Sequence, residues 1–129
     1  MFSKYNDNVA AIVLGLYLLG IASYVIQLFF TTEAWLIANE INVNATTIAR
    51  VMGGAWLGLG FGLFLTFLHG PDGQKVSFWS IGLAQIVTLL VLLYHHLVLS
   101  TAGTADDAAI VSVLTLLFLI GFFRIKSRL

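Results

Sequence analysis

The stretch VAAIVLGLYLLGIASYVIQLFF, residues 9–30, decides the fold. It contains no charged residue, and it is long enough to cross a bilayer, because a spanning helix needs about 20 mostly apolar residues. A cleaved signal peptide has a shorter apolar core that is followed by a cleavage site of small residues. No such site follows Phe30. The stretch therefore predicts a retained membrane-spanning helix.

Three further apolar segments follow, at residues 51–68, 76–99 and 108–123. Charged residues make up only 9% of the 129-residue chain, against about 25% in soluble domains. The mean hydropathy of +0.99 points the same way. The sequence predicts an all-α, integral membrane four-helix bundle, with residues 1–129 forming a single transmembrane domain.

The charged residues orient this bundle, because cytoplasmic loops carry an excess of Lys and Arg. Four spans place both termini on one side, together with the turn between the second and third helices. The basic residues on that side are Lys4, Lys75, Arg124, Lys126 and Arg128. The other side carries Glu33, Glu40, Asp106, Asp107 and a single Arg50. We therefore expect both the N and C termini to be cytoplasmic.

The connections carry recognisable signals. Gly70 can end the second helix and Pro71 cannot continue it, so Asp72 and Gly73 are expected to form a tight turn. In the outer loop, residues 31–49, Thr32 is a plausible N-cap for a short helix lying in the membrane interface. An ordinary connecting loop is the alternative. Thr104 and Asp107 fit a capping box at the start of the fourth helix.

A glycine stripe marks the second helix, since Gly54, Gly58 and Gly62 recur at four-residue intervals and share one face. Gly53 and Gly60 widen the smooth area. Small-xxx-small stripes let membrane helices approach closely and drive their packing. The stripe predicts a helix-packing interface, either with a neighbouring helix of the same bundle or with another molecule. A flat lipid or quinone ring is a further occupant.

Two adjacent histidines, His95 and His96, lie in the outer third of the third helix. At 100° per residue, His96 shares a polar stripe with Gln85 and Thr88, and His95 flanks Thr88. Polar side chains are costly against lipid, so the stripe should face protein or a water-filled cavity. Gln27 of the first helix lies at similar depth.

Arg50 departs from two trends. It is a cation near a helix N-terminus, where the helix dipole disfavours positive charge. It is also the one basic residue on the outer side. We expect an acidic partner among Glu33, Glu40, Asp106 and Asp107. The functional alternative is an outward-facing pocket for a polar or anionic head group, formed by Arg50, His95, His96, Gln85 and Gln27.

Several classes of function are disfavoured. The absence of cysteine excludes thiolate metal sites, and balanced charge argues against nucleic acid as a partner. Adjacent histidines point about 100° apart, so both cannot easily bind one metal ion, and His69 lies at the opposite membrane face. No catalytic constellation stands out. We expect no metal, no cofactor and no enzymatic activity, although a ligand shared by subunits stays open.

The run ARVMGGAWLGLGFGLFL, residues 49–65, resembles the second helix of small four-helix bacterial membrane proteins of the DoxX-like type. In these families an arginine often precedes a glycine-rich run, here Arg50 followed by Gly53, Gly54, Gly58 and Gly60. The resemblance implies a four-helix bundle in the bacterial inner membrane and little about activity. The histidine pair lies outside the pattern.

Strong packing motifs with almost no chemistry favour a small accessory or structural subunit. Such a subunit would pack through Gly54, Gly58 and Gly62 into a homo-oligomer or a larger membrane complex. The alternative is a binding protein for a small amphiphile, a lipid or quinone, held near Arg50, His95 and His96. The expected partners are therefore the bilayer, other membrane subunits or the chain itself.

Overall fold

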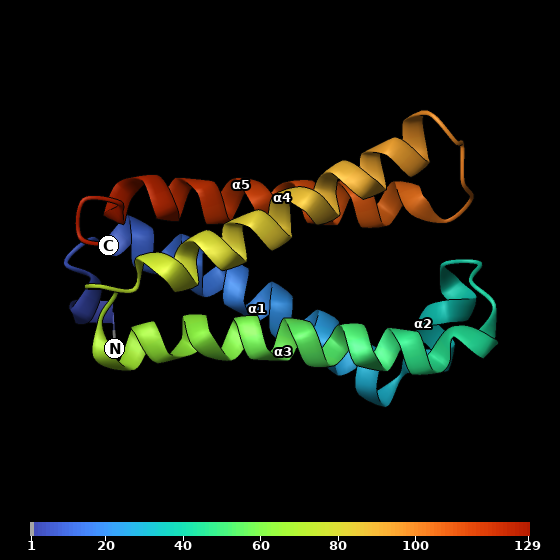
Figure 1. The fold of residues 1–129 in the computed structure, drawn as a ribbon, viewed down its shortest axis with the longest axis horizontal. Helices are drawn as coiled ribbons and strands as arrows, with labels where there is room; N and C mark the ends of the chain where they lie inside the picture. Colours follow the sequence, from blue (N-terminus) through green and yellow to red (C-terminus); the bar gives the residue numbers. More distant parts are fainter. Residues whose placement is uncertain (1) are drawn as a thin grey trace.

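The computed structural model describes residues 2–129, with side-chain positions from Lys4 onward. The four long helices are α1 (Asn8–Phe30), α3 (Thr46–His69), α4 (Lys75–Leu97) and α5 (Thr104–Ile125), as Figure 1 shows. A short helix, α2 (Thr32–Ala38), and the 3₁₀ turns η1 (Phe2–Tyr5) and η2 (Val43–Ala45) complete the described part. No strand occurs in residues 2–129. The all-α prediction is confirmed.

Each long helix contains a window that is apolar and long enough to cross a membrane. Helix α3 begins at Thr46, before the predicted start at residue 51, and α5 covers residues 104–125 where residues 108–123 were predicted. Segment ends are polar and helix-compatible, so hydropathy alone underestimates them. The composition and the structure together indicate an integral membrane protein.

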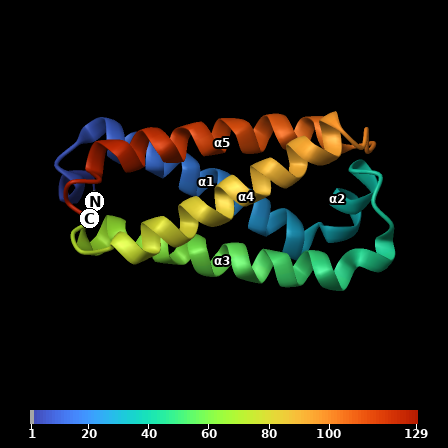
Figure 2. The same cartoon turned by 45° about the horizontal axis from the view of Figure 1, so that its top comes forward.

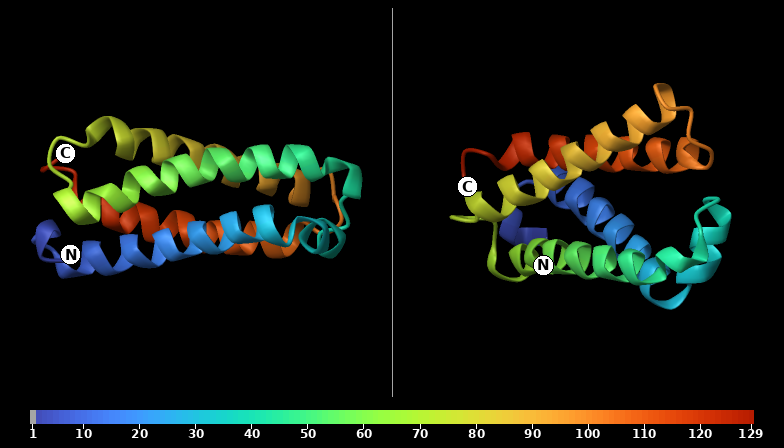
Figure 3. Two further views of the ribbon diagram at one scale, coloured as in Figure 1. Left: turned by 90° about the horizontal axis from the view of Figure 1, so that it is seen from below. Right: turned by 45° about the vertical axis from the view of Figure 1, so that its right-hand side comes forward.

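Helix α1 occupies the middle of the bundle, packing against α3 on one side and α5 on the other. Helix α4 packs along α5 and diverges from α3 beyond their hairpin, as Figures 1 and 2 show. The left view of Figure 3 shows α1 and α3 side by side. Both termini lie at the same end of the bundle as the turn between α3 and α4.

Glycines allow this close packing between the helices. A Cβ atom on Gly60 of α3 would come within 2.9 Å of the Ile21 side chain of α1, which is closer than two non-bonded carbon atoms approach. Gly121 of α5 accepts Leu14 of α1 in the same way. Comparable close approaches at other helix contacts involve Gly20 with Leu114, Gly53 with Leu28, and Gly82 with Phe118. The bundle therefore uses glycines on all four long helices.

The end that carries the termini is held by arginine contacts, and we call it the closed end. Arg128 donates to Asp72 at 2.6 Å and to the backbone oxygens of Tyr5 and Lys4. Arg124 pairs with Asp7 at 2.9 Å. Through Arg128, the chain end connects the first residues to the turn at Asp72.

The opposite end, which we call the open end, comprises α2, the start of α3, the last turns of α4 and the loop to α5. The short outer helix is present, but its N-cap is Thr31. Thr32, the predicted cap, is instead buried and donates to the Leu28 carbonyl at 2.6 Å.

The predicted capping box at Thr104 is wrong. Gly103 caps α5 with a φ of 74°, and the Thr104 hydroxyl donates to the Thr101 carbonyl at 2.7 Å. A side chain at Gly103 would collide with the backbone of Asn39, so the two outer loops touch there. Their contact requires a glycine in left-handed backbone geometry, and this requirement overrides the capping pattern.

Candidate functional site

The outward face of α3 carries the glycine stripe. Gly54 and Gly58 are exposed, and a Cβ atom added to Gly54, Gly58 or Gly62 would have no atom within 4 Å. Gly58 lies about 160° around the helix from Gly60, since consecutive residues are 100° apart. Gly60 faces α1, so the stripe faces directly away from the bundle.

This orientation overturns one of the two predicted roles of the stripe. Packing against a neighbouring helix of the same bundle is wrong, because Gly53 and Gly60 supply that contact for α3. Five glycines in the run were interpreted as one surface, whereas the helix divides them between opposite faces. An interface of Gly54, Gly58 and Gly62 with another molecule stays a prediction.

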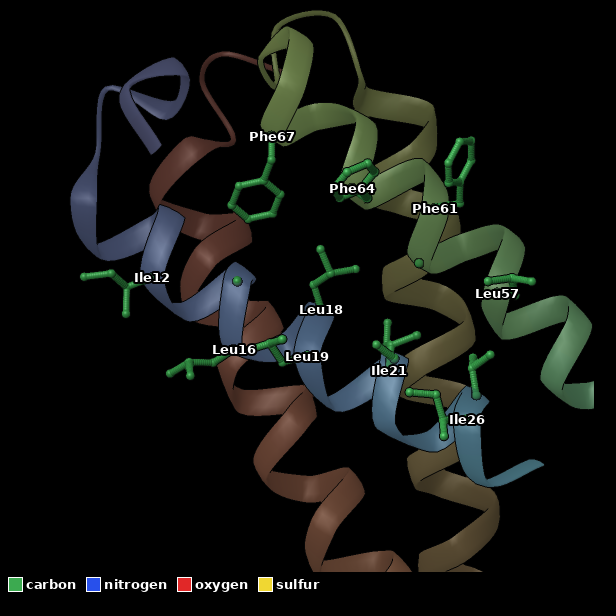
Figure 4. Close-up of a pocket in the computed structure, with 14 residues that line it drawn as sticks. Ile12, Leu16, Leu18, Leu19, Ile21, Ile26, Leu57, Phe61, Phe64 and Phe67 are labelled. Carbon is green, nitrogen blue, oxygen red and sulfur yellow. The ribbon is translucent and has the colours of Figure 1, made fainter. Parts of the chain in front are cut away.

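Beside the stripe, an apolar groove of about 690 Å³ runs between α1 and α3. Figure 4 shows Leu18 and Ile21 of α1 pointing toward α3, which carries Phe64 on the other side of the groove. Gly60 lies on its floor, where the two helices come closest. Every lining residue is apolar. The groove suits a hydrocarbon chain or an apolar helix, and it has no group that could perform acid–base chemistry.

Gln85 lies in the core and not in an outer pocket. It accepts from the Tyr17 hydroxyl at 2.9 Å and donates to the Thr115 hydroxyl at 3.0 Å. Its amide also reaches the Val111 carbonyl at 3.3 Å. These bonds join α1, α4 and α5 near mid-bundle, and a satisfied polar group of this kind stabilises helix packing in lipid. The role of Gln85 is therefore structural.

The two histidines remain near the surface at the open end. His95 Nδ1 lies 3.3 Å from the Thr101 hydroxyl, and its ring contacts Tyr94 edge-on at 6.0 Å between centroids. His96 is exposed. Gln85 is the last buried residue of α4, so the polar stripe leaves the core as α4 diverges from α3. Gln85 is buried, Thr88 is half-buried and His96 is exposed, so the expectation that this stripe faces protein holds fully for Gln85 alone.

Arg50 does not form the expected ion pair. Within the described residues the salt bridges are those of Arg124 and Arg128. Arg50 instead donates to the Thr32 hydroxyl at 3.4 Å, a long hydrogen bond that connects α3 to α2. The prediction of an acidic partner is wrong, because Arg50 forms this hydrogen bond to a neutral hydroxyl and no salt bridge among the described residues.

The five proposed pocket residues do not form one site. Gln27 is exposed on α1, Gln85 is buried, and no hydrogen bond joins Arg50 to either histidine within residues 4–129. None of the five lines the α1–α3 groove. Sequence depth placed them at similar heights, but their positions around the helix axes separate them.

Two titratable groups at the closed end, Asp7 and Tyr5, have shifted pKa values. The hydrogen bond from Arg124, reinforced by the Ala10 amide, lowers the pKa of Asp7. Burial raises the pKa of Tyr5 to about 12, although its bond to Thr66 and the nearby Arg128 act in the opposite direction. Within residues 2–129, no group of three His, Cys, Asp or Glu side chains could hold a metal ion.

The groove was missed at the sequence level. Its α1 wall includes Ile12, Leu16 and Leu19, which belong to a uniformly apolar run without contrast between faces. The regular glycine spacing of α3 was the one available signal, and it marks the surface next to the groove.

No protein-family model, no curated protein and no solved structure matches the chain.

Proposed function

We propose that this protein is a small integral membrane subunit that assembles with another membrane-spanning helix through the outward face of α3. The observation that carries the proposal is the empty surroundings of Gly54, Gly58 and Gly62. The chain already has glycines for its own packing, so this second, regularly spaced set is available to a partner.

The physical reason is the weak driving force for helix association in lipid. Lipid tails are as apolar as leucine, so membrane helices associate where small residues allow close backbone contact. Phe61 and Leu65 are exposed and lie about 60° and 20° from Gly58, on the same side of the stripe, where both would contact an incoming helix. A homo-oligomer and a larger membrane complex both satisfy this geometry, and the proposed role requires no catalysis.

The proposed membrane placement follows from charge. The closed end carries five of the six basic residues, so we place it and both termini in the cytoplasm. The DoxX-like resemblance of residues 50–62 supports placement in a bacterial inner membrane.

The experiment is native mass spectrometry of the protein extracted in mild detergent. The wild type should appear above the mass of one chain, and Gly58→Leu should appear as the single chain. Because Gly58 is exposed and an added Cβ atom would have no atom within 4 Å, Gly58→Leu should keep its helix content and thermal midpoint.

Ala109→Leu on α5 is the matched control, because Ala109 is also a small, exposed residue of a spanning helix. This variant should retain the assembled mass. A wild type that is monomeric in every mild detergent, or a Gly58→Leu variant that stays assembled, would refute the proposed interface.

The groove supports a second candidate, the binding of an apolar tail from a lipid or quinone. Its volume of about 690 Å³ lies within the range of small-molecule sites. This candidate predicts a ligand-bearing monomer in the same spectra and loss of that added mass in Ala22→Phe, which narrows the groove. An unaltered ligand mass in Ala22→Phe would exclude the groove as the site.

A further inference from the structure

A second apolar crevice, of about 110 Å³, lies between α4 and α5 near the closed end. Trp79 and Leu83 of α4 form one wall, Phe122 of α5 forms the other, and Gly82 leaves room at the floor. The rings of Trp79 and Phe122 meet edge-on, with 5.4 Å between centroids. Trp79 is 58% exposed, as suits a tryptophan at a membrane interface.

Two lysines flank the crevice on the side of the closed end. Lys75 precedes Trp79 by four residues and Lys126 follows Phe122 by four, so each lies about 40° around its helix from a wall residue. Lys126 Nζ lies 5.4 Å from the ring centroid of Phe123, beside this wall. Both lysines are exposed. The crevice thus has an apolar interior and a cationic mouth.

These lysines have no carboxylate partner within residues 4–129. The two carboxylates of the closed end, Asp7 and Asp72, are engaged by Arg124 and Arg128. The acidic residues that remain in the chain, Glu33, Glu40, Asp106 and Asp107, belong to the open end. The positive charge at the mouth of the crevice is therefore unbalanced within the protein.

We propose that this crevice binds one anionic phospholipid, with its phosphate between Lys75 and Lys126 and an acyl chain along Trp79 and Phe122. Charge complementarity selects the occupant, because a neutral helix or tail would leave both ammonium groups unpaired. Cytoplasmic leaflets are rich in anionic lipid, and each nearby lysine strengthens binding roughly fivefold. The α3 face has no part in this site, so the proposal is independent of assembly.

The test measures quenching of Trp79 fluorescence in vesicles. The full chain is reconstituted in phosphatidylcholine that contains increasing fractions of brominated phosphatidylglycerol or, separately, brominated phosphatidylcholine. Subtracting the Trp79→Phe signal isolates Trp79 from the other tryptophans. Phosphatidylglycerol should quench Trp79 at a mole fraction roughly 25-fold lower than phosphatidylcholine, because two lysines each contribute about fivefold.

Lys75→Gln combined with Lys126→Gln should abolish this preference without loss of helix content, since both side chains are exposed. Lys4→Gln is the matched control, because Lys4 is exposed at the same end and does not line the crevice. The control should retain the preference. Equal quenching by the two lipids in the wild type would overturn the proposal. A preference for phosphatidylglycerol that survives the double substitution would also overturn it. The same holds if Lys4→Gln lowers the preference as much as the double substitution does, since equal effects indicate diffuse electrostatic attraction without a site.

Discussion

The closed and open ends of the bundle contrast in how their polar groups are used. At the closed end, two arginines bind two aspartates at 2.9 and 2.6 Å, and one of them also donates to two backbone carbonyls. At the open end, Arg50 and His95 form only long hydrogen bonds, and α4 has no buried residue beyond Gln85. Charged residues alone therefore do not hold the helix ends together. They do so at the closed end, where the first and last residues of the chain bring opposite charges into contact.

The largest effect should come from Arg128→Ala at the closed end. It removes the bonds to Asp72 and to the carbonyls of Tyr5 and Lys4, and it should lower the free energy of unfolding by about 2 kcal/mol. Denaturant titration in mixed micelles, followed by circular dichroism, measures this free energy. Arg128→Lys retains the positive charge without the planar guanidinium, so its free energy of unfolding should lie between those of the wild type and Arg128→Ala. A loss below about 0.5 kcal/mol would show that the closed end does not depend on this contact.

Gln85→Leu tests the hydrogen-bond network that lies between the closed and open ends. It should leave the Tyr17 and Thr115 hydroxyls without their mutual partner and cost about 1 kcal/mol, in keeping with interhelical hydrogen bonds in membranes. The same titration provides the value, with Ser80→Leu, an exposed polar residue on α4, as control. Greater stability of Gln85→Leu than of the control would mean that the network contributes specificity and no stability.

Acidification should weaken the closed end through Asp7. Because the pKa of Asp7 is lowered in the folded state, its contribution is present above the unfolded pKa of about 4 and is lost as pH falls through the folded value. The thermal midpoint of the wild type should therefore fall below about pH 4, and Asp7→Asn should lose that part of the dependence. An identical profile in Asp7→Asn would exclude the Asp7–Arg124 pair as its source.

The smallest effect should come from His96→Leu at the open end. His96 is exposed and has no hydrogen-bond partner within residues 4–129, so the change in unfolding free energy should stay within about 0.5 kcal/mol. Urea or detergent titration resolves such a difference poorly, so the thermal midpoint is the better measure. A clear destabilisation would show that the open end is more closely packed than the exposure of His96 indicates.

Hydropathy and helical periodicity predict different properties of the candidate site residues. Hydropathy placed Arg50, His95, His96, Gln85 and Gln27 at related heights in the membrane, and periodicity placed Gly54, Gly58 and Gly62 on one face. Neither could say which face is covered. That depends on the packing partners of each helix, and α1 and α5 are joined by close approaches, such as Gly121 with Leu14, that no local pattern encodes.

Length, apolar content and charge act locally along the chain, so the sequence predicts the four long apolar helices and the concentration of basic residues at one end. It leaves the short outer helix as one of two alternatives. The outward orientation of the glycine stripe, the burial of Gln85 and the position of Arg50 beside Thr32 follow only from the packing of the helices. These outcomes depend on how α4 diverges from α3 and on which helix fills the space beside α1. In a chain that is apolar on every face, the sequence pattern does not distinguish the buried side of a helix from the lipid-facing side.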